Sequence, residues 1–222
     1  MKFARACILL TGVLAVPSIA ASKSLLRVDL PELGRIRVEG HIVPDHVPRI
    51  RLITVNGTSL LGFTLGEAGP PEADSPLAPR VAAMLRTLPG VEGPLIVVAA
   101  ASPHGTAIMY EVAIVGVVSG KLQLLHAPWT VTDMGGVYVG NLGPGNGVGV
   151  AAWDFVWDNC HICSHHYDVR IYPWDGSGKR FSRRAARNLR SRGAYDTDAQ
   201  GLQDLGLNYT SLLHGIPEFN GF

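Results

Sequence analysis

The stretch 153–174, WDFVWDNCHICSHHYDVRIYPW, decides the fold, because both of its ends alternate apolar and polar residues around a polar loop. Such alternation is typical of β-strands that bury one face. The apolar faces consist of Trp153, Phe155 and Trp157 on the first strand and Tyr167, Val169 and Ile171 on the second. One antiparallel register serves both strands, because it pairs Trp157 with Tyr167 in the core and Asp154 with Arg170 outside. We therefore predict an aromatic hairpin with Trp153, Phe155 and Trp157 all buried.

The rest of the chain has the composition of a protein built from short strands and turns. Of its 222 residues 47% are hydrophobic and only 17% are charged, and the chain contains 26 Gly and 15 Pro. Helical bundles, coiled coils and long disordered chains need far more charged residues and far less glycine. Short apolar segments separated by turn residues favour a mainly β fold, either an antiparallel β-sandwich or a few stacked propeller-like blades.

Two helices and three segments complete the predicted organisation. Ser75 followed by Pro76 is typical of a helix start, so we expect a short helix near 76–88 within a Pro-rich break at 69–90. Ser182 can cap a second, basic helix near 182–191. The predicted segments are a signal peptide at 1–20, an antiparallel β domain at 24–175, and a basic helix with a C-terminal strap or tail at 176–222.

The first residues have the pattern of a bacterial export signal. Lys2 and Arg5 precede an apolar stretch at 8–16, and Ser18-Ile19-Ala20 fits a signal-peptidase cleavage site. No apolar run reaches the length of about 20 residues that a membrane span needs. We expect a periplasmic or secreted protein without a membrane span, and a formal net charge of +1 gives no reason to expect a nucleic-acid partner.

The loop between the two hairpin strands concentrates the reactive side chains of the chain. In an oxidising compartment two cysteines spaced as Cys160 and Cys163 favour a disulfide that staples the loop. The alternative is a zinc or copper site, for which Asp158 would orient His166. Its ligands would be Cys160, His161, Cys163, His165 and His166. A thiol–disulfide oxidoreductase ranks third, because the residues after Cys163 have a strand pattern and not the long helix that such sites use.

The stretch 136–150, GVYVGNLGPGNGVGV, followed by the aromatic hairpin and Tyr172-Pro173-Trp174-Asp175-Gly176, resembles the FG-GAP/VCBS-type repeats of exported bacterial proteins. The resemblance covers residues 136–181 and implies a scaffold for adhesion or ligand binding. In that family the loop after the first strand carries carboxylates that bind calcium. Asn141, Gly143 and Asn146 occupy those places here, so we do not expect calcium, which needs several carboxylate ligands.

A basic run follows the hairpin, with seven Lys and Arg and no acid between residues 179 and 192. On a helix Arg183, Arg187 and Arg190 would share one face. That face would dock an anionic glycan or another envelope component; the alternative is a solvated helix that neutralises acids of the tail. No catalytic constellation stands out. The function we expect is an exported, non-catalytic β-domain, a binding or envelope-structural module without a cofactor.

Overall fold

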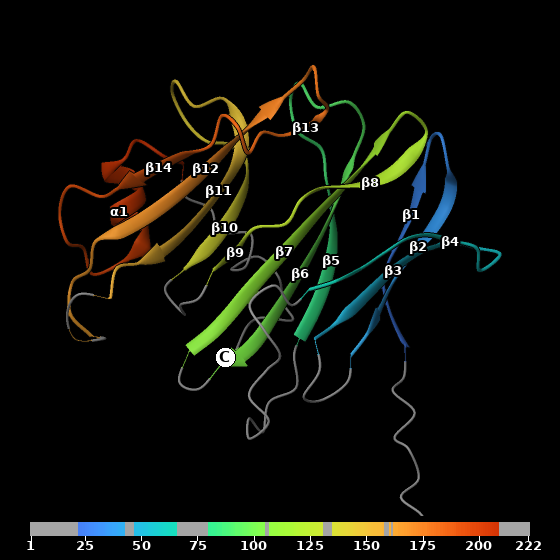
Figure 1. Cartoon of the computed structure of the whole chain (residues 1–222), viewed down its shortest axis with the longest axis horizontal. Helices are drawn as coiled ribbons and strands as arrows, with labels where there is room; N and C mark the ends of the chain where they lie inside the picture. The colour runs from blue at the N-terminus through green and yellow to red at the C-terminus, as the bar shows by residue number, and fades with distance from the viewer. Residues whose placement is uncertain are drawn as a thin grey trace, which may run out of the picture.

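The part of the chain that the structure describes folds into three antiparallel β-sheets and one short helix, which confirms the mainly β fold class. The computed structural model describes residues 22–42, 47–65, 80–104, 107–130, 135–157, 160 and 162–208. The predicted signal peptide at 1–20 lies outside these residues. In each sheet the first four strands form a meander, in which strands that follow one another along the chain lie side by side. The three sheets pack one after another across the molecule (Figure 1).

The first sheet has the order β1-β2-β3-β4. Its strands are β1 (Ser22–Leu30), β2 (Gly34–His41), β3 (Arg49–Thr54) and β4 (Ser59–Thr64). Period-two alternation gives this sheet one apolar and one charged face: Ile36 and Val38 are buried, whereas Arg35 between the turn and Ile36 is exposed. The apolar face packs against the second sheet.

The second sheet is the middle layer and has the order β5-β6-β7-β8, with β9 paired to β7. Its strands are β5 (Arg80–Arg86), β6 (Leu95–His104), β7 (Ala107–Val118), β8 (Lys121–His126) and β9 (Trp129–Thr130). Ile96 and Val98 pack toward the first sheet, and Val97 toward the third. Burial on both faces explains the continuous apolar sequence of β6.

The third sheet contains the predicted hairpin. Its strands are β10 (Gly136–Asn141), β11 (Val148–Phe155), β12 (Tyr167–Asp175), β13 (Arg180–Phe181) and β14 (Arg187–Arg190). Both β13 and β14 pair with β12, at its two ends. The helix α1 (Asp198–Asp204) covers the outer face of this sheet, where Leu202 joins a core cluster with Trp153.

The hairpin forms between β11 and β12, but its register differs by two residues from the predicted one. Trp153 lies opposite Val169, and Phe155 lies opposite Tyr167. A slip of two residues keeps every side chain on its face, so the predicted burial of these four residues is confirmed. The prediction for Trp157 is wrong: this residue lies beyond the end of β11, and 67% of it is exposed.

The predicted contact between Asp154 and Arg170 is present as an ion pair of 3.2 Å, although the residue directly opposite Asp154 is Asp168. Arg170 therefore reaches diagonally across the sheet, which the length of its side chain allows. The other predicted polar pair, Asp158 with His166, includes a residue outside the described part of the chain.

Neither helix forms at its predicted place. Residues 80–86 of the first are strand β5, which pairs with β6 along its whole length, and residues 76–79 lie outside the described residues. In the second, β14 replaces the helix, because Arg187–Arg190 pair with Asp168–Ile171 of β12. Sheet pairing overrides local helix signals in both segments. Within the described residues, no helix is long and apolar enough to cross a membrane.

Candidate functional site

A cleft of about 600 Å³ lies between β8 and the chain around β13, and we call it the His126 cleft. Two continuous segments line it: residues 123–127 from the middle sheet and residues 178–184 from the third sheet. Strands β8 and β13 contact each other although they belong to different sheets. The cleft therefore exists only because the second and third sheets pack together.

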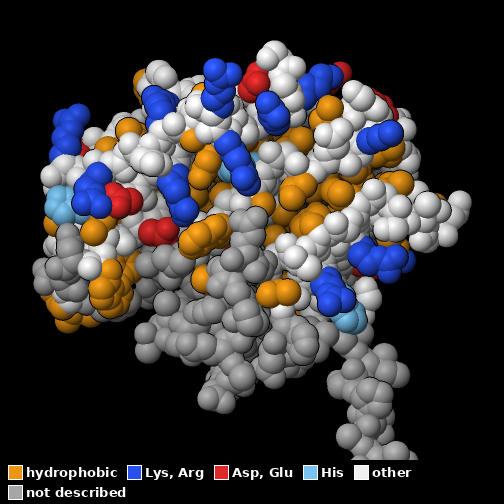
Figure 2. Space-filling model, in the orientation of Figure 1, with side chains coloured by type: hydrophobic (Ala, Val, Ile, Leu, Met, Phe, Trp, Pro, Cys, Tyr) orange, Lys and Arg blue, Asp and Glu red, His pale blue; other side chains and the backbone are white. Residues whose placement is uncertain are grey.

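The two walls of the cleft differ in chemistry. The β8 wall is mostly apolar and includes Leu124, which is 44% exposed. The opposite wall is cationic and contains Lys179, Arg180, Arg183 and Arg184. Figure 2 shows Lys and Arg side chains gathered over the upper part of the molecule, where β8 and β13 lie in Figure 1, beside hydrophobic surface. This arrangement suits an anionic ligand that also has an apolar part.

The positive charges of the cleft are only partly compensated. Lys179 Nζ lies 2.5 Å from a carboxylate oxygen of Glu92, and this contact raises the pKa of Lys179 and lowers that of Glu92. Arg180 lies near Asp175 and helps to lower the pKa of that carboxyl group, behind hydrogen bonds from Ser177 and Gly178. Arg183 and Arg184 pair with no acidic side chain among the described residues. Excess positive charge therefore lies at this end of the cleft.

His126 forms part of the cleft and is buried, with 6% of its surface exposed. Its ring packs on Tyr172 at 4.1 Å between centroids and lies 6.3 Å from Phe181. Burial, and then the positive charges of Arg183 and Arg170, lower the pKa of His126 to about 4. The ring is therefore neutral at neutral pH. Its Nε2 has no hydrogen-bond partner within the described part of the chain, and such an atom calls for a water or a ligand.

The disulfide predicted in the hairpin loop is present: Cys160 and Cys163 are bonded to each other, with their Cα atoms 5.2 Å apart. The Cys163 amide also donates a hydrogen bond of 3.0 Å to the Cys160 carbonyl, which closes a tight turn. Ile162 within this turn is 94% exposed. His161 and Asp158, both named for the alternative metal site, lie outside the described residues.

The two described histidines of the loop contact backbone oxygens. His165 is buried beside Phe155, at 4.3 Å between ring centroids, and its Nδ1 lies 3.2 Å from the Val156 carbonyl. His166 Nδ1 lies 3.1 Å from the Ser191 carbonyl. Among the described residues, no group of three or more His, Cys, Asp and Glu is arranged to hold a metal ion. Packing and chain anchoring account for both histidines.

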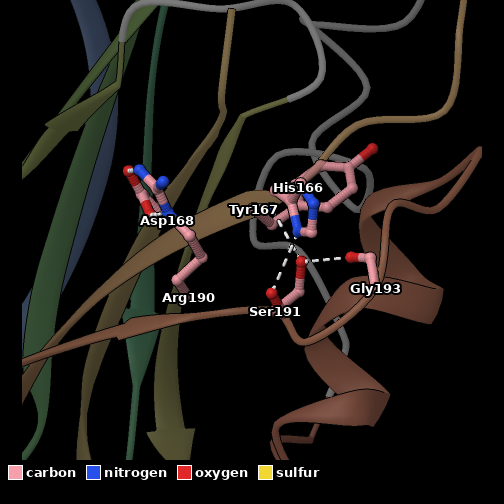
Figure 3. A network of polar contacts seen from close by, with 6 residues as sticks. All are labelled: His166, Tyr167, Asp168, Arg190, Ser191 and Gly193. Carbon is pink, nitrogen blue, oxygen red and sulfur yellow. Dashed lines mark hydrogen bonds and ion pairs between the residues drawn. The ribbon is translucent and has the colours of Figure 1, made fainter. Parts of the chain in front are cut away.

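Around His166 a small polar network ties the chain after β14 to β12 (Figure 3). The Ser191 hydroxyl accepts a hydrogen bond of 3.0 Å from the Tyr167 amide and donates one of 2.8 Å to the Gly193 carbonyl. Arg190 holds both carboxylate oxygens of Asp168, at 2.6 and 2.7 Å. These bonds satisfy groups inside the fold, so the network is structural.

The three arginines predicted to share one face are separated by the structure. Arg183 lines the His126 cleft. Arg187 donates a hydrogen bond of 2.7 Å to the side-chain oxygen of Asn146, and Arg190 pairs with Asp168. A strand in place of the helix explains the separation. Sequence reasoning missed His126 and Leu124, because a single histidine at the end of a strand carries no pattern of its own.

The glycine-rich loop between β10 and β11 is held by amide and guanidinium groups. Asn141 accepts a hydrogen bond of 3.1 Å from the Gly143 amide, and its carbonyl accepts one of 2.8 Å from the side chain of Asn208. Arg187 binds Asn146 on the other side of the loop. Cationic and neutral groups thus occupy a loop in which FG-GAP/VCBS-type repeats carry acids.

Comparisons with protein-family models, with curated proteins and with solved structures found no match to this chain. The resemblance of residues 136–181 to FG-GAP/VCBS-type repeats stays a prediction. A functional proposal for this protein therefore rests on the chemistry of its own residues. Within the described part of the chain, arginines without an acidic partner and a buried nitrogen without a hydrogen-bond partner occur together in the His126 cleft.

Proposed function

We propose that the protein is an exported, non-catalytic binding module, and that its His126 cleft takes an anionic ligand. The observation that carries this proposal is the pair Arg183 and Arg184, which line the cleft without an acidic partner among the described residues. Arginines without an acidic partner attract anions, and the apolar part of the cleft can contact the rest of the ligand. The cleft volume of about 600 Å³ lies within the usual range for ligand sites.

The chemistry of the lining favours binding over catalysis. General acid–base catalysis needs a group whose pKa lies near the working pH. The pKa of His126 is lowered to about 4, and the other ionisable groups of the lining are Lys179 and three arginines. A neutral imidazole can instead exchange a hydrogen bond with the bound anion or with a water beside it.

Two further features support an exported binding scaffold. The export pattern of residues 1–20 and the bonded pair Cys160 and Cys163 support secretion, because disulfides persist in oxidising compartments. The FG-GAP/VCBS resemblance supports a binding scaffold. Each of the three sheets contains a meander of four antiparallel strands, and β-propeller blades are four-stranded sheets too.

The metal-binding alternative needs free thiolates at Cys160 and Cys163, whereas an oxidoreductase would cycle the same pair between dithiol and disulfide. The mass and metal content of protein purified without reductant test the metal site. The reduction potential of the pair tests the oxidoreductase, because a value below about −300 mV indicates a structural bridge. We expect a mass two daltons below that of the reduced chain and no stoichiometric metal. Titratable thiols together with stoichiometric zinc or copper would instead establish the metal site, and with it a different function.

Calorimetric titration with inorganic tripolyphosphate, at low and at physiological salt, tests anion binding. We expect the double variant Arg183→Gln/Arg184→Gln to bind about tenfold more weakly or worse, because hydrogen bonds to charged groups contribute about 1.5 to 3 kcal/mol each. The matched control is Arg49→Gln/Arg51→Gln, which removes the same charge from two exposed positions of the first sheet. Equal weakening in both double variants would mean that net charge alone attracts the anion, and the cleft proposal would fail.

A further inference from the structure

The His126 cleft lies between the ends of two neighbouring sheets. One side is five consecutive residues, 123–127, from the end of β8 and the chain that follows it, and the other side is seven consecutive residues, 178–184, around β13. Each wall is therefore a continuous stretch of chain, which an extended ligand can follow.

Strand β8 lies at the edge of the middle sheet, next to β7. It pairs with β7 on one side, from Lys121 opposite Val118 to His126 opposite Ile114. On its other side no backbone hydrogen bond joins it to the described residues. An edge of this kind presents N–H and C=O groups to any chain that lies beside it.

Strand β13 ends the third sheet in the same way. It pairs with β12 through Phe181 opposite Trp174 and Arg180 opposite Asp175, and it contacts β8 across the cleft. Strands β8 and β13 belong to neighbouring sheets in Figure 1. A chain that adds to the unpaired edge of β8 would therefore lie near the cationic wall of the cleft.

The positive charge of the cleft wall favours an acidic ligand. Of the four cationic side chains in the wall, Lys179 is paired with Glu92, whereas Arg183 and Arg184 pair with no acid in the described residues. Arginine presents a planar fork that matches a carboxylate. The exposed Leu124 on the opposite wall offers an apolar contact to side chains that alternate with the acids.

We infer that the His126 cleft takes an extended acidic segment of a partner protein, which adds to the free edge of β8 and pairs its carboxylates with Arg183 and Arg184. The inference rests on the proposed function and names the ligand of that site. Main-chain hydrogen bonds to β8 supply affinity in this mode, and alternate side chains supply specificity. The register shift at Leu125 interrupts the edge, so the added strand is short, about four to six residues.

Three fluorescent peptides of equal length distinguish strand addition from charge attraction. The first alternates Glu and Val, the second has the same sequence with every second amide N-methylated, and the third has Lys in place of Glu. We expect the first to bind at least tenfold more tightly than the other two in an anisotropy titration. The second keeps the charge but loses backbone donors, and the third has the wrong charge.

Amide hydrogen exchange gives an independent readout on the protein. Binding of the Glu-Val peptide should slow exchange in residues 121–126, because amides that pointed to solvent become hydrogen-bonded. The double variant Arg183→Gln/Arg184→Gln should weaken binding of the peptide about tenfold, and the control Arg49→Gln/Arg51→Gln should weaken it less than twofold.

The outcomes separate this inference from the proposed function. Equal binding of the N-methylated and unmodified peptides, with tripolyphosphate still bound, would overturn strand addition and leave an anion site. A sulfated oligosaccharide that binds more tightly than the Glu-Val peptide without slowing exchange in β8 would overturn it in favour of a glycan. Failure of both tripolyphosphate and peptide to bind would remove the proposed function as well.

Discussion

Two groups of arginines on the third sheet and the chain after it differ in what surrounds them. Arg170 and Arg190 form one group, which we call the paired face: Arg170 binds Asp154 at 3.2 Å, and Arg190 binds Asp168 through two hydrogen bonds. Arg183 and Arg184 form the other group and line the His126 cleft without an acidic partner among the described residues.

The paired face also contains a hollow, of about 330 Å³, lined by Asp154, Asp168, Arg170 and Arg190. Its charges neutralise one another inside the protein, so an incoming ion would have to break existing pairs. In the His126 cleft Arg183 and Arg184 have no acidic partner among the described residues, so under the proposed function an anion would not have to displace one there. The two groups therefore differ in whether an acidic side chain of the protein already binds the guanidinium groups.

The largest expected effect concerns His126 and the positive field around it. Its pKa of about 4 in the folded protein lies below its ordinary value of 6.5, so the unfolded chain binds more protons between these pH values. Stability is then complete above pH 6.5 and falls by about 3 kcal/mol as the pH drops to 4. Urea unfolding at pH 7 and pH 4 measures this loss, which tripolyphosphate in the cleft should reduce.

His126→Phe is the control for that measurement, because an aromatic ring remains beside Tyr172 while the titrating group is removed. The variant should lose about 3 kcal/mol less than the wild type between pH 7 and pH 4. An equal loss of stability in both proteins would show that other groups cause the acid sensitivity, and that the pKa of His126 is not lowered in the folded protein.

The next effect concerns the paired face. Arg170→Ala removes the ion pair to Asp154, a hydrogen bond of 2.5 Å to the Trp129 carbonyl, and the stacking of the guanidinium over the Trp129 ring at 5.2 Å. We expect a loss of about 2 to 3 kcal/mol in the free energy of unfolding, because all three contacts of Arg170 are lost together. Chemical denaturation measures it. A loss under about 0.5 kcal/mol would mean that the paired face is not structural.

A smaller effect is expected at the exposed end of the same face. Arg190→Gln breaks the contact with Asp168, whose pKa is lowered chiefly by the hydrogen bonds from Arg190. Both side chains are half exposed, so solvent screens the pair and the loss should be about 0.5 to 1 kcal/mol. The loss should shrink as the pH falls below 3.8, the ordinary pKa of an aspartate, and through the lowered pKa of Asp168 in the folded protein. Denaturation at pH 7 and at a series of pH values below 4 tests both statements.

The smallest effect on stability is expected in the cleft. Arg183→Gln/Arg184→Gln should change the free energy of unfolding by at most about 0.5 kcal/mol, because neither arginine pairs with an acid among the described residues. The same variant should weaken anion binding about tenfold. A stability loss as large as that of Arg170→Ala would place these arginines with the paired face, and the contrast between the two groups would disappear.

Much of the hairpin follows from its residue pattern, and its register does not. Trp153 and Phe155 are buried as predicted, because alternation determines which face of a strand is apolar. A slip of two residues preserves that alternation, so the pattern permits the predicted register and the observed one equally. The observed register leaves Trp157 outside the sheet, since the backbone of His165 pairs with Tyr195 and lengthens the loop.

The basic run shows where local signals mislead. Ser182 followed by spaced arginines predicts a helix, and Ser182 does accept a hydrogen bond from the Ala185 amide, as a cap would. Only one turn forms before β14 begins, because Arg187–Arg190 pair with the side of β12 that β11 leaves unpaired. The presence of that open side is a property of the third sheet and cannot be read from the run itself.

The amino-acid sequence alone determined the mainly β class, the buried face of each hairpin strand and the closeness of Cys160 to Cys163, because each of these depends on neighbours a few residues apart. Tertiary structure alone decided which arginines are neutralised and which face the His126 cleft. That distinction depends on residues separated by dozens of positions, such as His126 and Arg183, which meet only when two sheets pack together.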